Sequence, residues 1–216
     1  MIVVSDMMGT LTTGSPVIGL VDWVRHNQSG RQARLFMASI MPGYLIAKLG
    51  LRDWQSWAQQ TMIDSLRLVR DVTPEKMKGV GEWAVEHNLW KKRRQDVIAR
   101  LIEHKSNGAQ VYIASSVIEP LIEPFARQVG VQFIGTPVEY ENGHVRLAGD
   151  LVAQENKIGQ VLSRLGVERL DFAYGDTAQD IPLLEHADHP VAIYPDDKLK
   201  AAALERGWEI LGSRDK

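Results

Sequence analysis

The chain has 216 residues, 44% of them hydrophobic, which is enough for one good core and a smaller module. Its formal net charge of −2 and pI of about 6.3 argue against a nucleic acid or another polyanion as a partner. The chain contains no cysteine, which excludes disulfides, thiolate nucleophiles and cysteine-based metal sites.

The first residues predict a buried strand that ends in a carboxylate. Residues 2–4 are β-branched and uninterrupted, as in a strand covered on both faces. Asp6 follows at the carboxyl end of this strand, where open α/β sheets bind ligands. Gly9 allows backbone amides to approach a ligand closely. Taken alone, the same pattern also fits an ordinary strand followed by a turn.

The N-terminus shows neither a basic segment nor a long apolar segment, so we expect no signal peptide. The most apolar stretch, residues 35–49, contains Pro42, Gly43 and Lys48 and falls short of the ~20 apolar residues that a membrane span needs. We therefore expect a soluble, cytoplasmic protein that has no membrane partner. The sequence leaves the oligomeric state open.

Helical patterns and no convincing strand run from Val17 to about Lys105. The apolar residues predict helices over residues 17–24, over 35–49 with a break at Pro42-Gly43, and over 54–66. A further helix is expected to start at Thr73-Pro74, because a capping hydroxyl precedes a proline there. Residues 96–102 continue this last helix towards a stop at Asn107-Gly108.

The second half of the chain alternates between strand and helix patterns. The sequence predicts strands over residues 111–114, 131–134, 170–174 and 191–194, and helices over 120–129, 156–165, 181–186 and 198–206. Asn142-Gly143, between two short β-prone runs, predicts a hairpin. Alternation of this kind is typical of an α/β fold with a mainly parallel sheet.

Four segments, taken in order, resemble the motifs of the haloacid-dehalogenase-like (HAD) phosphohydrolase superfamily. They are residues 3–12 around Asp6, the run that ends at Ser115-Ser116, the segment around Lys157, and Gly175-Asp176 with Asp180. The closest likeness is to the phosphoserine-phosphatase-like branch, which residues 195–199 and 206–210 also resemble. The resemblance implies a Rossmann-like α/β core over residues 1–15 and 106–216, with a helical cap inserted after the first strand, over residues 16–105.

The resemblance also implies a nucleophile and a metal ion. Asp6 corresponds to the carboxylate that attacks phosphorus and forms an aspartyl phosphate. Asp6, Asp176 and the backbone carbonyl of Met8 correspond to the ligands of a Mg²⁺ ion, which prefers oxygen. Asp180 resembles the acid that supports this metal site, directly or through water.

The phosphate site that the resemblance implies surrounds these carboxylates. Lys157 offsets the charge of the transferred phosphate, and Ser115 donates a hydrogen bond to it, with Ser116 as the rival for that role. The remaining positions around the phosphate are Met7, Gly9 and Thr10, of which Thr10 is expected to fix the loop by hydrogen bonding. The expected substrate is a small phosphorylated metabolite.

Met8 departs from the family pattern. The first motif of the family reads Asp-x-Asp-x-Thr, and its second acid protonates the leaving alcohol and later activates water; a thioether does neither. General acid–base catalysis contributes ~10²–10⁴-fold. Three outcomes fit: a slow enzyme, an enzyme restricted to good leaving groups, or a protein that binds Mg²⁺ and phosphate without useful turnover. A surrogate acid supplied by the cap is a further alternative.

Other interpretations of the sequence remain open. A non-enzymatic, regulatory phosphate-binding protein is the alternative that Met8 favours, and a dehalogenase is a third hypothesis, although it leaves Asp176 and Asp180 without a purpose. Lys91–Arg94 is interpreted as a solvated helix face, with a basic rim for a phosphorylated substrate as the minority interpretation. Arg67 and Arg70 are expected to form surface salt bridges rather than to bind substrate.

Overall fold

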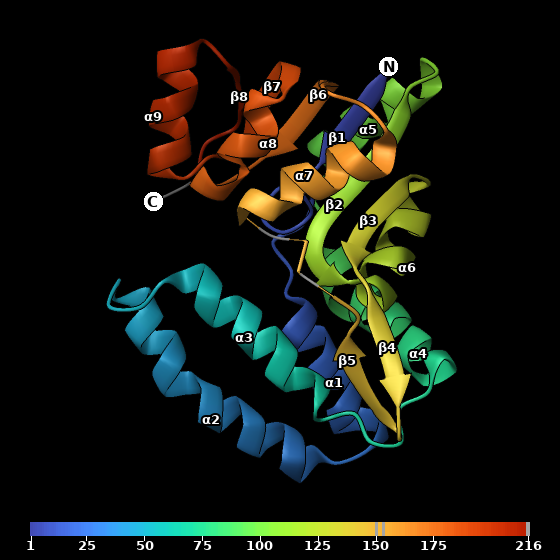
Figure 1. The fold of residues 1–216 in the computed structure, drawn as a ribbon. Coiled ribbons are helices and arrows are strands. Elements are labelled where there is room, and N and C mark those ends of the chain that lie inside the picture. The colour runs from blue at the N-terminus through green and yellow to red at the C-terminus, as the bar shows by residue number, and fades with distance from the viewer. Residues whose placement is uncertain (150, 153, 215–216) are drawn as a thin grey trace.

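A central six-stranded sheet organises the computed structural model, which describes residues 1–149, 151–152 and 154–214. Its strand order is β3-β2-β1-β6-β7-β8, and every neighbouring pair is parallel (Figure 1). The predicted α/β class with a mainly parallel sheet is therefore confirmed. The six strands are β1 (Ile2–Ser5), β2 (Gln110–Ile118), β3 (Gln132–Thr136), β6 (Leu170–Gly175), β7 (Ala187–Ile193) and β8 (Glu209–Leu211).

Helices separate the strands in the order that the sequence predicts. Between β1 and β2 lie α1 (Pro16–Asn27), α2 (Gly30–Lys48), α3 (Trp54–Leu66), α4 (Pro74–Ala84) and α5 (Gln95–Ser106). The later helices are α6 (Glu119–Val129), α7 (Gln154–Leu165), α8 (Ile181–Glu185) and α9 (Asp197–Arg206). Within the described part of the chain, none of these helices is long and apolar enough to cross a membrane.

Both faces of the sheet are buried, as the β-branched run at the start of the chain predicts. Successive residues of β1 point to opposite faces, so Val3 joins one hydrophobic core and Val4 joins the other. The first core also takes in residues of α1 and α4, such as Leu20 and Met77. This arrangement fixes β1 at the centre of the sheet, with β2 on one side and β6 on the other.

The predicted break in α2 is wrong, because the helix continues through Pro42-Gly43. Proline removes one backbone donor, but the carbonyl that loses its partner belongs to exposed Ala38 and can be solvated instead. The glycine at position 43 is explained by packing, because a Cβ there would lie 2.7 Å from Nε1 of Trp57. The missing side chain thus lets α3 pack closely against α2.

The helix that the sequence extends from Pro74 to residue 105 is instead divided. After α4 the chain forms a π-helical turn over Val85–Leu89 and a 3₁₀ turn over Trp90–Lys92 before α5 begins. Arg93 and Arg94 have extended backbones, so the run Lys91–Arg94 is not the helix face that was predicted. The interruption turns Arg94 towards the end of β1, where it contacts the loop after Asp6.

Two strands differ by several residues from their predicted bounds, and a third was not predicted at all. Strand β2 is longer than expected and includes Ser115 and Ser116, with a shift in its register against β3 between Ala114 and Ile118. Strand β7 begins before Val191 and ends before Tyr194, which has a positive φ of 41°. The short strand β8 was not predicted, because its three residues carry no clear alternation.

The predicted hairpin is confirmed, and it lies beside the helical part of the molecule rather than in the main sheet. Strands β4 (Val138–Glu141) and β5 (His144–Leu147) pair antiparallel around Asn142-Gly143. Figure 1 shows the hairpin next to α1 and α4, and the N–H of Val72 donates to the carbonyl of Gly143. The division into a core over residues 1–15 and 106–216 and a cap over 16–105 remains a prediction.

Candidate active site

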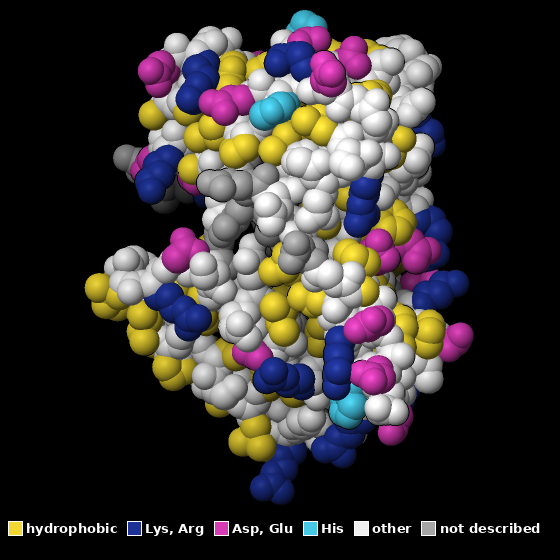
Figure 2. All heavy atoms as spheres, in the orientation of Figure 1, with side chains coloured by type: hydrophobic (Ala, Val, Ile, Leu, Met, Phe, Trp, Pro, Cys, Tyr) yellow, Lys and Arg dark blue, Asp and Glu magenta, His cyan; other side chains and the backbone are white. Residues whose placement is uncertain are grey.

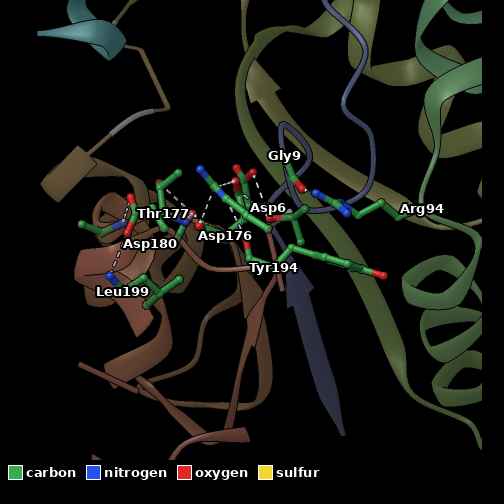
Figure 3. Close-up of polar contacts among 12 residues, drawn as sticks. Asp6, Gly9, Arg94, Asp176, Thr177, Asp180, Tyr194 and Leu199 are labelled. Carbon is green, nitrogen blue, oxygen red and sulfur yellow. Dashed lines mark hydrogen bonds and ion pairs between the residues drawn. The ribbon is translucent and has the colours of Figure 1, made fainter. Parts of the chain in front are cut away.

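Three aspartates meet at the carboxyl ends of two neighbouring parallel strands. Asp6 follows β1 and Asp176 follows β6, and the Asp6 N–H donates to the Tyr174 carbonyl at 2.9 Å. Asp180 ends the 3₁₀ turn that comes after β6. One oxygen from each carboxylate can be chosen so that all three lie within 4.8 Å of one another, and all three residues are buried (Figure 3).

Lys157 supplies positive charge from α7. Its Nζ lies 2.6 Å from Oδ1 of Asp6 and 3.0 Å from Oδ1 of Asp180, and the side chain is buried. Burial alone would lower the pKa of Lys157, but the carboxylates of Asp180 and Asp6 outweigh it and hold the pKa above its usual value. The lysine is therefore a permanent cation next to the Asp6 carboxylate.

Two of the three carboxyl groups have raised pKa values. Burial raises the pKa of Asp6 from 3.8 to about 6, although Lys157 opposes the shift. Burial, followed by the charges of Asp6 and Asp180, raises the pKa of Asp176 to about 8. Lys157 and, at Asp176, Arg214 offset part of the charge of the three buried acids, and an added cation would favour the ionised forms of Asp6 and Asp176.

The loop after β1 is shaped to reach these carboxylates. Gly9 has a φ of 87°, and a Cβ there would lie 2.0 Å from Oδ2 of Asp176, so no larger residue fits. Thr10 is fully buried, and its hydroxyl lies 3.1 Å from Oδ1 of Asp176 and 3.4 Å from Oδ2 of Asp6. The threonine therefore holds the two strand ends together from behind.

Asp180 uses its two oxygens for different tasks. Its Oδ2 accepts hydrogen bonds from the N–H groups of Asp176 and Thr177, while Oδ1 faces Lys157. Gly175 makes this possible, because a Cβ at that position would lie 2.3 Å from the Cβ of Asp180. Asp180 thus fixes both the loop that carries Asp176 and the ammonium group that faces Asp6.

The other residues that the sequence singles out are divided between the cleft and the core. Ser115 and Ser116 of β2 line the cleft above the carboxylates, as do Met8 and Gly9. Met7 has a fully buried side chain that belongs to the first core. Met8 is partly buried: it packs against the first core and is also one of the residues that line the cleft.

Three residues at the site were not anticipated from the sequence. Arg94 donates from Nε to the carbonyl of Gly9 at 2.9 Å and lies over the ring of Tyr194 at 3.7 Å (Figure 3). Arg214 donates to the backbone carbonyl of Asp176 at 2.9 Å and to its Oδ2 at 2.6 Å. Arg214 therefore offsets part of the charge of the Asp176 carboxylate.

The path of the C-terminal segment depends on another glycine. Gly212 has a φ of 75°, and a Cβ there would lie 2.4 Å from the ring of Tyr194. The segment therefore passes close over this ring and brings Arg214 to Asp176. Polar residues near a chain end carry no periodic pattern, so the sequence offers no signal for this contact.

The donor set fits a divalent metal ion. Mg²⁺ prefers carboxylate and carbonyl oxygens and usually keeps several waters. Asp6 and Asp176 offer such oxygens in a buried acidic cluster at the edge of an open cleft. Burial is the first cause of the raised pKa values of both acids, and a bound cation would offset the charge that their ionisation places in the site.

Comparisons with known proteins agree with this geometry. The model of the haloacid dehalogenase-like hydrolase family matches residues 3–185. Phosphoserine phosphatase SerB1 of Mycobacterium tuberculosis is 34% identical over 114 residues, which cover 50% of this chain and 37% of that protein. A histidinol-phosphatase of Neisseria meningitidis is 28% identical over 119 residues, which cover 50% of this chain and 54% of that protein. The chain therefore spans about half or less of the length of these curated relatives.

Solved structures share the fold over nearly the whole chain. A protein of unknown function from Bordetella pertussis has a TM-score of 0.77 at 22% identity, with 98% of this chain and 97% of that chain covered. A substrate-bound phosphoserine phosphatase has a TM-score of 0.63 at 18% identity, with 99% and 93% covered. At these identities the likeness establishes the fold alone.

Proposed function

The chain belongs to the haloacid dehalogenase-like hydrolases, and we propose that it is a Mg²⁺-dependent phosphatase that acts through an aspartyl phosphate on Asp6. The observation that carries the proposal is the contact of Asp6 Oδ1 with Lys157 Nζ at 2.6 Å, beside Asp176 and Asp180. A buried carboxylate that faces a buried ammonium group at the end of a central strand is placed to attack an electrophile and to have its charge offset.

In the first step, Asp6 attacks the phosphorus atom of the substrate. A bond forms between a carboxylate oxygen and phosphorus, and the bond from phosphorus to the leaving oxygen breaks. Lys157 lies close enough to Asp6 to stabilise the phosphoryl oxygens during the transfer, and Asp180 keeps its ammonium group in place. Ser115, with Ser116 as its neighbour, offers a hydroxyl donor from β2, the strand that pairs with β1.

Asp6, Asp176 and the backbone carbonyl of Met8 would hold Mg²⁺, and Asp180 positions this group from behind. When bound, the ion neutralises charge on the carboxylates and on the phosphate. A backbone carbonyl does not depend on its side chain, so a methionine at position 8 is compatible with metal binding.

Met8 is expected to limit proton transfer during the reaction rather than the binding of Mg²⁺ or phosphate. Met8 is a residue of the cleft, and a thioether can neither give a proton to a leaving alkoxide nor take one from water. The enzyme is therefore expected to be slow with alkyl phosphates and to favour leaving groups that are already weak bases. The second candidate function, a regulatory protein that binds Mg²⁺ and phosphate without turnover, is favoured by this same residue.

A test of the proposal is phosphorylation of Asp6 itself. Incubation with acetyl phosphate and Mg²⁺ is expected to give a long-lived aspartyl phosphate, because hydrolysis lacks a general base. Peptide mass spectrometry after incubation with and without Mg²⁺ locates the adduct. Turnover of acetyl phosphate without any adduct on Asp6 would contradict the mechanism, and neither turnover nor adduct would favour the regulatory function.

The stability of the metal-free protein is expected to fall as the pH rises. The pKa values of Asp6 and Asp176 are about 6 and about 8 in the folded protein, above the ordinary value of 3.8. Their protonation therefore stabilises the folded state fully below about pH 4, and this contribution is lost as the pH rises to about 8. Added Mg²⁺ is expected to restore stability most strongly at the alkaline end, where both acids are ionised.

Chemical denaturation with a chelator or with Mg²⁺, at about pH 5 and at about pH 8, measures both effects. The variant Asp176→Asn is the control, because it removes the group with the higher pKa and should flatten the pH dependence. An equal gain in stability from Mg²⁺ at both pH values would argue against a site built from these carboxylates.

A further inference from the structure

The wall of the cleft that faces the carboxylates is apolar. The cleft has a volume of about 1540 Å³ and extends from the aspartates to α1, α2 and α3. Figure 2 shows the surface hollowed between the part of the molecule that carries α9 and the part that carries α2 and α3. Small-molecule sites usually occupy ~300–1,000 Å³, so the cleft has room for much more than a phosphate and a short side chain.

Large apolar side chains of α2 and α3 line this wall, among them Met37, Met41, Tyr44, Trp54, Trp57 and Ile63. The three aromatic side chains pack on one another. The centre of the Tyr44 ring lies 5.7 Å from the centre of the Trp54 ring and 5.8 Å from that of the Trp57 ring. Aromatic clusters of this geometry are stiff and offer much contact area at a low entropic cost. Trp54 remains 47% exposed, so part of that area is available to a ligand.

Positive charge is confined to the opposite side of the cleft. Among the described residues that line it, the cations are Arg94, Lys157, Lys198 and Arg214, and none of them lies on α1, α2 or α3. Three of these have partners at the catalytic end: Lys157 pairs with Asp6 and Asp180, Arg214 with Asp176, and Arg94 with the Gly9 carbonyl. On the apolar side, the only charged residue among the described lining residues is Asp53, which is an anion.

The charge distribution excludes one kind of substrate group from the apolar wall. A carboxylate placed against α2 and α3 would lose water without gaining a cationic partner among the described lining residues, and it would face Asp53. Lys48 of α2 lies 6.0 Å from the centre of the Tyr44 ring but is not one of these lining residues. Arg67 does not serve as that partner, because it pairs with Asp64 at 3.1 Å and is absent from the described lining. An apolar group at the same place gains contact with the rings and with Met41.

We infer that the substrate is a monosubstituted phosphate whose organic part is bulky and apolar and carries no carboxylate. The inference rests on the proposed function, because it places the phosphate at Asp6 and Lys157 and the organic part against α2 and α3. An alkyl or acyl chain and an aromatic ring share the required chemistry. The phosphate of an amino acid such as serine does not share it.

Binding of phosphonates tests the inference without requiring turnover. Isothermal titration calorimetry with Mg²⁺ compares methyl-, butyl-, octyl- and phenylphosphonate with the phosphonate isostere of phosphoserine. Affinity is expected to rise about threefold to fourfold per added methylene until the chain fills the wall, and phenylphosphonate reports whether a ring is preferred to a chain. Butylphosphonate is expected to bind at least about tenfold more tightly than the phosphoserine isostere, which must bury an unpaired carboxylate.

A matched pair of variants on one helix locates the effect. Met41 and Leu45 are both exposed residues of α2, at 46% and 51%, but Met41 lines the cleft and Leu45 is absent from the described lining. Met41→Gln and Trp54→Ala are expected to weaken octylphosphonate several-fold and to leave methylphosphonate unchanged. Leu45→Gln is expected to change neither.

The outcomes separate the inference from the function on which it rests. If affinity does not depend on chain length, or if the phosphoserine isostere binds as tightly as butylphosphonate, the inference is overturned while the phosphate site stands. Equal losses in the Met41 and Leu45 variants would also overturn it. If no phosphonate binds and inorganic phosphate does not bind either, the proposed function itself fails.

Discussion

Asp6→Asn is expected to lower phosphatase activity by about 10⁵-fold or more, the scale seen when a covalent hydrolase loses its nucleophile. An amide at this position cannot form the aspartyl phosphate, and it also removes the anion that Lys157 faces at 2.6 Å. Activity measured with acetyl phosphate and Mg²⁺ gives the loss, and mass spectrometry is expected to find no adduct. Because a neutral amide avoids the cost of burying the Asp6 charge, which raises the pKa of that acid to about 6, the variant in the presence of a chelator should unfold no more easily than the wild type above about pH 6.

The control for this change is Asp64→Asn. Asp64 forms an exposed ion pair with Arg67 on α3, so its loss should alter neither activity nor stability by a measurable amount. If Asp6→Asn kept activity within about tenfold of the wild type, the nucleophile would have to be another group. If it unfolded the protein at neutral pH, the activity result could be read only from binding of phosphate and Mg²⁺ to folded material.

The sheet and its catalytic edge were predictable because their patterns are local. A β-branched run predicts a strand buried on both faces, and an acid at its end comes to the ligand-binding edge of a parallel sheet. Asp6 and Asp176 follow this rule, so their meeting could be expected from two separate stretches of sequence. The hairpin was predictable for a similar reason, since Asn142 and Gly143 both adopt the positive φ that its tight turn requires.

The helices between β1 and β2 were less predictable because they are shaped by their neighbours. Pro42 predicts a break, yet exposure of the carbonyl that it leaves unpaired makes the continuous helix tolerable. Helical periodicity likewise does not show that a π-helical turn at residues 85–89 ends one helix and redirects the chain before the next. Arg94 therefore looked like part of a solvated helix face, although it contacts the Gly9 loop.

Long-range contacts of single side chains had no sequence signal. Arg214 contacts Asp176 because Gly212 lets the C-terminal segment pass over the Tyr194 ring. The apolar wall of the cleft could not be predicted for the same reason. Tyr44 and Trp57 lie on different helices, and their ring contact depends on the absence of a side chain at Gly43. Tryptophans in a helical pattern are more often core than ligand-binding, so their place in the cleft required the fold.

Met8→Asp is expected to raise the rate with an alkyl phosphate by about 10²–10⁴-fold. Met8 lines the cleft two residues after the proposed nucleophile, so we expect a carboxyl group there to reach the leaving oxygen and later a water molecule. The departing alkoxide is a strong base, and protonation lowers its barrier most. Single-turnover kinetics with an alkyl phosphate measures the gain, and Met8→Asn, which is polar but cannot exchange a proton, is the matched control.

The leaving group decides whether this gain comes from acid catalysis. Acetyl phosphate releases a carboxylate that needs no proton, so Met8→Asp should leave the formation of its aspartyl phosphate nearly unchanged and quicken only the later hydrolysis. A new carboxylate beside Asp6 and Asp176 adds repulsion in a cluster whose pKa values are already raised, so the variant should need Mg²⁺ more than the wild type does. If formation of the aspartyl phosphate is accelerated equally with both substrates, or equally in Met8→Asn, position 8 does not supply the missing acid. Acceleration of this step with the alkyl phosphate alone would show that the lack of an acid at position 8 limits phosphoryl transfer in the natural protein.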